Sequence, residues 1–271
     1  MWIVSFIVAL ALLYIGLVSA VSLAQTKLLF PTYLASSSRL QLPASAERLE
    51  LTTPSGEHLV GVRLPPASTQ AARERLILGF GGNAWNADVM VRYLHAVFPE
   101  EEIVTFHYRG YAPSSGSPSA KALLSDALTV FDHLQHGRKR QVIAVGFSIG
   151  SGVAAYLGSQ RPLAGLILVT PFDSLEALAR DHYPWAPVGL LLRHHIPTIN
   201  FVRDVRTPTA LIAAGRDTIV PAQRTEPLRR AIPHLIFDHT IADAGHNDLY
   251  DHPAFASTMR SAVEQIVGHR R

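Results

Sequence analysis

Apolar and polar residues alternate along most of the chain in a pattern that predicts β-strands interleaved with amphipathic helices. The strands are expected at 47–52, 58–64, 75–80, 102–107, 141–147, 163–169, 208–214 and 235–241. The helices are expected at about 88–97, 119–135, 149–160, 174–180, 222–231 and 252–267. The first two strands follow each other without a helix, which predicts an antiparallel start. The later interleaving predicts one mostly parallel, eight-stranded sheet with helices on both faces.

The first residues differ from the rest of the chain, because no charged residue occurs between Trp2 and Thr26. As a helix, this run is long enough to span about 30 Å of hydrocarbon. We expect residues 1–25 to be an uncleaved, single-pass membrane anchor, since no Lys or Arg precedes the run and it is longer than a usual signal core. The alternative is a signal segment, cleaved after Val18-Ser19-Ala20 or Ser22-Leu23-Ala24, that would leave a secreted or periplasmic protein.

The region after this run reads as a linker followed by one large domain. Residues 26–46 contain Pro31, Pro43 and a cluster of serines, which is typical of a linker. Residues 47–271 are then expected to form a single α/β domain. Because 48% of the chain is hydrophobic, that domain can bury a sizeable core.

The composition excludes several kinds of site. The 24 basic and 21 acidic residues give a net charge of only +3, which is too balanced to indicate nucleic-acid binding. There is no cysteine, so thiol catalysis, disulfides and thiolate-bound metals are excluded. No His-Glu-x-x-His sequence and no tight cluster of His and Asp indicates a metal site, although the chain has 13 histidines.

A serine between two glycines follows the expected strand 141–147, in the sequence "GFSIG". Such a turn from strand to helix forces its central residue into a strained backbone conformation, and Gly146 and Gly150 leave room for it. Ser148 would then lie at a helix N-terminus, where backbone N–H groups stabilise negative charge. One interpretation is a plain turn. The strand-to-helix context favours the other, that Ser148 is a nucleophile.

A serine nucleophile needs a base, and the base needs an orienting acid. Asp217 follows an apolar strand through a glycine-containing turn and is the expected acid, although a capping role in the turn is the alternative. Asp173 is a rival acid, which we interpret as a helix cap because it precedes Ser174 and a helical pattern. His246 is the expected base, because it follows the last strand and Gly245 on a short loop.

Acyl chemistry also needs donors for the developing oxyanion. The N–H of Ile149, directly after the expected nucleophile, is one candidate. The second should come from the loop after strand 75–80, which reads "GFGGNAWN". Its glycines let the backbone approach a substrate, so the N–H of Asn83 is the candidate, with a simple glycine-rich turn as the alternative.

Together these segments resemble the α/β-hydrolase superfamily, and within it N-terminally membrane-anchored serine hydrolases related to depalmitoylases and serine-aminopeptidase-type proteins. The resemblance covers residues 25 to about 267 and rests on "KLLFP", "GGNA", "YRGYAPSSGSPS", "GFSIG", "GRDTIVP" and "AGHND". It implies an α/β-hydrolase fold with a catalytic domain over 47–271. It also implies that Ser148, Asp217 and His246 form a catalytic triad, and that Asn83 and Ile149 supply oxyanion donors.

Three positions depart from the family pattern. The oxyanion loop usually begins with His-Gly, and Gly81 occupies that histidine's place. Ala112 stands where the family motif has its last glycine, and His107 stands where the preceding strand usually ends in Asp. The motif at 108–110 is interpreted as mainly structural. The departures leave the expected triad intact.

The insertion between the sixth and seventh strands often forms a lid in this superfamily, and a small one is expected at 173–206. It contains the apolar and aromatic stretch "DHYPWAPVGLLLRHHIP". This stretch could line an acyl pocket, contact the membrane surface or simply cover the sheet. The sequence leaves these three alternatives open.

The function implied is hydrolysis of a carboxylic ester or thioester through an acyl-enzyme, with no metal or organic cofactor. The expected partners are a small-molecule or acyl-bearing substrate and, through the N-terminal helix, the membrane, with no nucleic acid. Two alternatives remain: an amidase or peptidase of the same fold, and a binding protein that keeps the fold without turnover.

Overall fold

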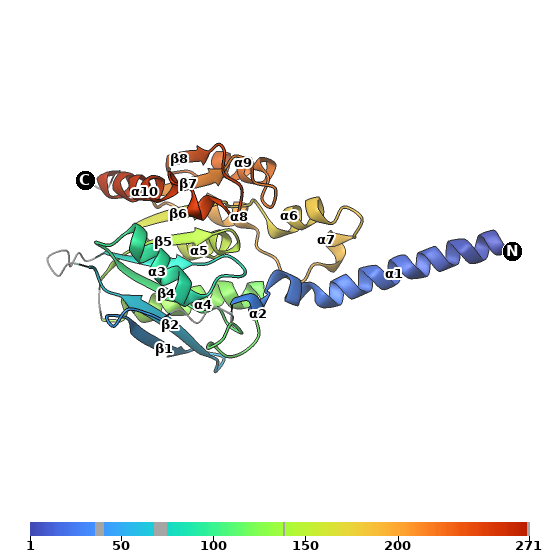
Figure 1. Cartoon of the computed structure of the whole chain (residues 1–271), viewed down its shortest axis with the longest axis horizontal. Coiled ribbons are helices and arrows are strands. Elements are labelled where there is room, and N and C mark those ends of the chain that lie inside the picture. The colour runs from blue at the N-terminus through green and yellow to red at the C-terminus, as the bar shows by residue number, and fades with distance from the viewer. Residues whose placement is uncertain (36–40, 68–74, 138, 270–271) are drawn as a thin grey trace.

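The computed structural model describes residues 1–35, 41–67, 75–137 and 139–269 (Figure 1). Eight strands form one sheet: β1 (Glu47–Thr52), β2 (His58–Leu64), β3 (Arg75–Phe80), β4 (Glu102–Phe106), β5 (Gln141–Phe147), β6 (Gly165–Val169), β7 (Thr209–Ala214) and β8 (Leu235–Ile241). Their spatial order is β1-β2-β4-β3-β5-β6-β7-β8. β2 pairs antiparallel with β1 and β4, and all the other pairs are parallel. The eight-stranded, mostly parallel sheet expected from the sequence is confirmed.

Helices cover both faces of this sheet. They are α3 (Ala87–Val97), α4 (Ala120–Gln135), α5 (Ile149–Gln160), α8 (Thr198–Arg203), α9 (Ala222–Ala231) and α10 (Phe255–His269). The helices α4, α5, α8 and α9 share one hydrophobic core, and α3 and α10 share another. Along β5, Val142 and Ala144 belong to the first core, while Ile143 and Val145 belong to the second. This period of two is the reason the central strands read as continuous apolar runs.

Small shifts at element ends have local causes. α10 begins at Phe255, later than expected, because a short 3₁₀ turn at Leu249–Asp251 and Pro253 precede it. The helix expected at 174–180 extends to His182 as α6 (Leu175–His182), with the Ser174 side chain capping the N–H of Ala177. β4, β6 and β7 are slightly shorter than expected.

The insertion between β6 and β7 holds α6, the short α7 (Val188–Leu191) and α8. α7 and α8 were not predicted, because each is too short for a helical period to stand out among prolines. Figure 1 shows α6 and α7 on the same side of the domain as the N-terminal helix. This insertion, residues 173–206, is called the lid below.

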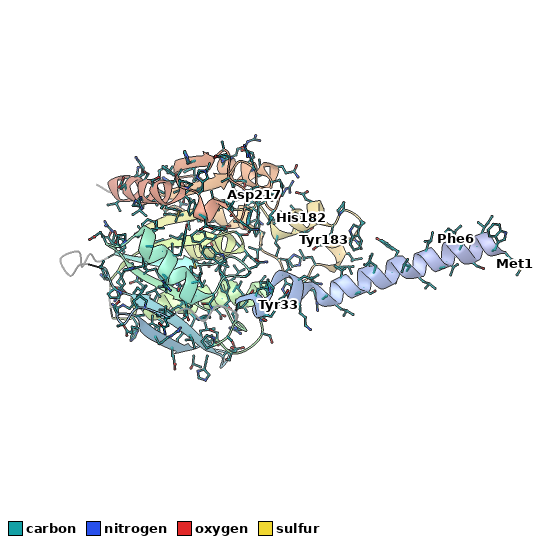
Figure 2. All side chains as sticks on the ribbon, in the orientation of Figure 1. Met1, Phe6, Tyr33, His182, Tyr183 and Asp217 are labelled. Atoms are coloured by element: carbon teal, nitrogen blue, oxygen red, sulfur yellow. The ribbon has the colours of Figure 1, made fainter. Side chains whose placement is uncertain are left out.

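The N-terminal run forms one long helix, α1 (Trp2–Leu29), which projects away from the domain (Figure 1). An 18-residue window in it has a mean hydropathy of 2.6, and none of that window is buried. Such a helix is compatible with a membrane anchor or with a signal sequence. Figure 2 shows Met1 and Phe6 on the projecting part, far from Asp217 in the domain.

The expected linker, 26–46, is helical in part. α1 continues to Leu29, and α2 (Thr32–Ala35) follows after Pro31. Phe30 and Ala35 are buried in the domain's core, and the Ala35 carbonyl accepts a hydrogen bond from Asn86 at 2.8 Å. Residues 36–40 of the expected linker lie outside the described residues. The end of α1 is therefore held against the domain rather than separated from it by a free tether.

Candidate active site

The sequence-predicted site residues all follow strands of the parallel part of the sheet, at their carboxyl ends. Asn83 follows β3, Ser148 follows β5, Asp217 follows β7 and His246 follows β8. The chain leaves β3 toward β4 on one side, whereas β5 lies on the other side. The crevice at such a reversal of strand order is where open α/β sheets bind ligands.

Ser148 occupies the strained turn expected of it. Its φ is 51° and its ψ is −116°, a backbone conformation that L-residues rarely adopt. Its N–H donates to the carbonyl of Val169, on β6, at 2.9 Å. Tertiary contacts are needed to hold a non-glycine residue in this conformation, and strained residues of this kind cluster at active sites in proteins.

The two flanking glycines are required by packing. A Cβ on Gly146 would collide with the backbone of Gly150, and a Cβ on Gly150 would collide with the carbonyl of Phe80, at the end of β3. The serine turn and the end of β3 therefore touch backbone to backbone. This close approach brings the loop after β3 beside Ser148.

Asp217 and His246 lie in direct contact. The distance from Asp217 Oδ2 to His246 Nδ1 is 2.7 Å, and their side chains are only 3% and 8% exposed. Asp217 Oδ1 accepts hydrogen bonds from the N–H groups of Ile219, at 2.9 Å, and Val220, at 2.7 Å. Since a carboxylate only accepts, the proton of a neutral His246 lies on Nδ1, and its Nε2 is left as an acceptor.

Backbone hydrogen bonds tie the Asp217 loop to the His246 loop. The N–H of Gly215 donates to Ile241 and that of Arg216 donates to Ala244, each at 2.8 Å. The Asp248 carboxylate accepts from the N–H of Gly245 at 2.6 Å, which shapes the turn that carries His246. The two side chains are thus positioned by main-chain contacts as well as by each other.

An aromatic cluster connects the histidine loop to the serine turn. The ring of Tyr250 lies 5.7 Å from that of Phe147, the residue before Ser148, and 4.9 Å from that of Trp85. Trp85 stacks on Phe147 at 5.0 Å. Burial raises the pKa of Tyr250 to about 12, so its phenol stays neutral. The loops after β3, β5 and β8 therefore meet in one place.

Some of the expected site residues contact one another in the structure, and others do not. It pairs Asp217 with His246 directly. It records no hydrogen bond of the Ser148 hydroxyl within the part of the chain that it describes. Catalytic hydrogen bonds of this kind often form only when substrate is bound.

Two tyrosines from the loop after β4 hold the expected oxyanion loop. The hydroxyl of Tyr108 donates to the carbonyl of Gly81 at 2.8 Å, and that of Tyr111 donates to the carbonyl of Asn83 at 2.6 Å. The peptide group that carries the Asn83 N–H lies between these two. Gly82 lies close to the serine, because a Cβ placed on it would be 3.9 Å from the Cβ of Ser148.

The sequence reasoning missed the part played by these tyrosines. It interpreted the 108–110 motif as structural and did not single out Tyr111. A signal was present, since two tyrosines in "YRGY" directly follow a strand that neighbours β3. What the sequence could not show was that both hydroxyls reach the same loop.

Two departures from the family pattern have structural reasons. A Cβ on Gly81 would lie 2.9 Å from the Cβ of Trp85, so a histidine does not fit there. His107 is buried, and its Nε2 lies 3.2 Å from Oδ1 of Asp88, on α3. Asp88 also forms an ion pair with Arg48 at 2.6 Å. The acidic group at this strand end is therefore supplied by a neighbouring helix.

The rival acid has other partners. Asp173 accepts from the N–H of Ser174 at 2.8 Å and lies 3.3 Å from the guanidinium of Arg224. Within residues 1–35, 41–67, 75–137 and 139–269, no group of three or more His, Asp or Glu side chains is placed to hold a metal ion.

Comparison with known proteins places this fold. No family model matches the chain. An uncharacterized protein of Mycobacterium tuberculosis (strain H37Rv) is 37% identical over 149 residues, which cover 54% of this chain and 53% of that protein. The match thus spans about half the length of that relative. The uncharacterized protein YfhR of Escherichia coli (strain K12) is 30% identical over 200 residues, covering 69% of this chain and 68% of that protein.

An α/β hydrolase domain-containing protein of Caenorhabditis elegans, aho-3, is 27% identical over 188 residues, covering 68% of this chain and 55% of that protein. Among solved structures, a membrane phospholipase A described as a bacterial virulence factor has a TM-score of 0.66, at 15% identity, and covers 97% of this chain and 98% of its own. The chain has the α/β-hydrolase fold. Pyrococcus furiosus esterase Pf2001 shares the fold with a TM-score of 0.63, at 16% identity, over 81% of this chain and 91% of its own.

The lid makes polar contacts with both the domain and α1. The ring of His194 packs edge-on against that of Phe30, with centroids 5.1 Å apart, and its Nε2 lies 2.8 Å from the hydroxyl of Thr26. The lid is therefore in contact with the end of α1.

Proposed function

We propose that this chain is a serine hydrolase that cleaves carboxylic esters or thioesters through an acyl-enzyme. The observation that carries the proposal is the 2.7 Å contact between Asp217 and His246 at the sheet edge where Ser148 occupies a strained turn. Esterases and phospholipases exist with this fold, so the fold accommodates such chemistry. The arrangement of the site residues, and not the fold alone, supports this reaction class.

In the proposed reaction, the Ser148 oxygen forms a bond to the carbonyl carbon of the substrate, and its proton passes to Nε2 of His246. The N–H groups of Asn83 and Ile149 stabilise the negative charge on the carbonyl oxygen. The bond to the alcohol or thiol then breaks, and that leaving group takes the proton from His246. Water repeats the sequence, releases the acid and restores Ser148.

Covalent labelling tests the nucleophile. A fluorophosphonate should label the purified full-length chain, and Ser148→Ala should abolish both labelling and hydrolysis of p-nitrophenyl butyrate. Ser159→Ala is the matched control, because that serine lies at the other end of α5, where its hydroxyl donates to the Tyr156 carbonyl and accepts from the Gln160 side chain. Labelling of a folded Ser148→Ala variant, or turnover above a few per cent of wild type, would overturn the proposal.

We also propose that residues 1–25 stay attached as a membrane anchor and that residues 47–271 are the catalytic domain. A spanning helix satisfies its backbone hydrogen bonds internally and buries its side chains in lipid, so carbonate washing should not release the protein. N-terminal sequencing of the membrane fraction is the test. A mature chain beginning at Val21 or Gln25 would identify a cleaved signal sequence instead.

A further inference from the structure

One exposed apolar surface lies outside the candidate active site. It is formed by the lid residues 183–192, "YPWAPVGLLL", which include no charged side chain. This segment is called the lid tip. The side chains of Tyr183, Trp185 and Leu190 are exposed to 39%, 40% and 83%. Apolar residues of this size clustered on an exposed surface mark a site of interaction.

The lid tip lies along α1. The hydroxyl of Tyr14 donates to the carbonyl of Trp185 at 2.9 Å, and Nε2 of Gln25 donates to that of Leu191 at 3.1 Å. Elsewhere an apolar groove lies between the lid tip and α1. It is lined by Val18, Val21, Leu28, Ala186, Val188 and Leu191, among others. Figure 2 shows Tyr183 beside the part of α1 nearer the domain.

The contact with Tyr14 indicates how deep in a bilayer the lid tip would lie. A helix needs about 20 residues to span the hydrocarbon core. Any such window within the uncharged run from Trp2 to Thr26 includes Tyr14. If α1 spans a bilayer, Trp185 is therefore at bilayer depth. At a rise of about 1.5 Å per residue, Tyr14 lies about 12 Å along the axis from Ser22.

Much of the lid-tip backbone has hydrogen-bond partners, which lowers the cost of moving it out of water. Pro184 and Pro187 carry no N–H, and the carbonyls of Trp185 and Leu191 are bonded by α1 side chains. Other N–H groups are bonded to carbonyls within the segment: those of Ala186, Val188, Leu190, Leu191 and Leu192. Backbone groups without such partners are costly in the hydrocarbon core, so these bonds favour entry of the segment into the bilayer.

Basic residues border the apolar segment where headgroups would lie. Arg193 directly follows the lid tip and donates to the carbonyl of Ser22 at 2.9 Å, and Lys27 lies near the end of α1. On the other side, Arg180 lies against Gly189 and is paired with Glu176 at 2.6 Å. Arginine and lysine at this boundary can pair with the anionic phosphates of lipid headgroups. Tyrosine and tryptophan are enriched at the membrane–water interface.

We propose that the lid tip is a second membrane-embedded element, inserted beside α1 into the same face of a phospholipid bilayer. The inference rests on the proposed anchor and is independent of the chemistry at Ser148. Interfacial elements typically enter about 5–10 Å past the headgroups, which is slightly less than the distance of about 12 Å from Ser22 to Tyr14. Two attachments, α1 and the lid tip, would hold the catalytic domain at a set height and orientation.

The absence of cysteine makes a direct test possible, because single cysteines can carry an environment-sensitive NBD dye. Leu190→Cys tests the lid tip, Leu13→Cys reports α1, and Gln265→Cys, on exposed α10, is the aqueous control. The labelled full-length chains are reconstituted in vesicles of phosphatidylcholine and phosphatidylglycerol. Each must retain p-nitrophenyl butyrate hydrolysis and the parent's melting temperature.

We expect dye at position 190 to emit at shorter wavelength than at 265, to be quenched by brominated lipid and to resist aqueous iodide. Emission and iodide access at 190 equal to those at 265, with position 13 in lipid, would overturn the inference while leaving the anchor standing. Water exposure at both 13 and 190 would overturn the anchor as well. Protection at 190 that brominated lipid does not quench and that disappears on dilution would identify a second copy of the chain as the occupant, which also overturns it.

Discussion

Nδ1 of His246 lies 2.7 Å from Oδ2 of Asp217, while the other oxygen of that carboxylate accepts two backbone N–H groups. The carboxylate therefore cannot turn away from the imidazole without breaking those two bonds. This arrangement holds the ring in one orientation and with its proton on one nitrogen. The acidic partner of the proposed base is defined by these contacts, and the first prediction follows from them.

Asp217→Asn should lower kcat on the order of 10⁴-fold, because an amide favours the wrong imidazole tautomer, as in triads whose acid is neutralised. Asp173→Asn is the matched control and should lower it far less, since that carboxylate contacts Arg224 and Ser174. Steady-state kinetics with p-nitrophenyl butyrate compare the two variants. The reverse ranking would assign the acidic role to Asp173.

Tyr111→Phe and Tyr108→Phe should each lower kcat by roughly 10- to 100-fold with little change in KM, because they loosen the loop that carries the Asn83 N–H. Tyr156→Phe is the control, since its ring lies in the C-terminal half of α5 and packs against that of Phe201, on α8. Full kinetic curves separate kcat from KM. A change confined to the melting temperature would show that the tyrosines act only on stability.

Gly150→Ala should destabilise the folded protein by about 1–3 kcal/mol or more, because the added Cβ collides with the carbonyl of Phe80. Gly268→Ala is the matched control: nothing lies within 4 Å of its Cβ position, and it is in α10. There the change should stabilise by up to about 1 kcal/mol. Urea unfolding in detergent measures both, and equal midpoints would contradict the close contact between the serine turn and β3.

The pH dependence of stability should reveal the partly buried carboxylate of Asp88. Burial opposes ionisation of Asp88, but hydrogen bonds from His107 and Arg48 outweigh it and lower its pKa to about 2, from 3.8. The ionised carboxylate therefore stabilises the fold fully above about pH 4, and this contribution is lost as the pH falls from 3.8 to about 2. Unfolding of wild type and Asp88→Asn between pH 2 and 7 should show a difference that shrinks across this window. A difference in stability that stays constant with pH would contradict the lowered pKa of Asp88.

Much of the fold was predictable because burial leaves a local trace in the sequence. β3 and β5 were predicted to the residue, since each central strand needs apolar side chains toward both cores and ends where the loop becomes polar or glycine-rich. The glycine-flanked serine was visible for a similar reason: the turn tolerates only small neighbours. The roles of Ser148, Asp217, His246, Asn83 and Ile149 remain predictions.

Only the tertiary structure decided which distant side chains meet. Asp217 and His246 are 29 positions apart, and the local sequences favoured Asp217 over Asp173 without showing which carboxylate contacts His246. The hydroxyls of Tyr108 and Tyr111 reach the loop after β3 because β3 and β4 are neighbours in the sheet. The sequence left three alternatives open for the lid, and the contact between Tyr14 and Trp185 favours one of them. Periodicity records whether a residue is buried, whereas its partner depends on how loops far apart in the chain close on one another.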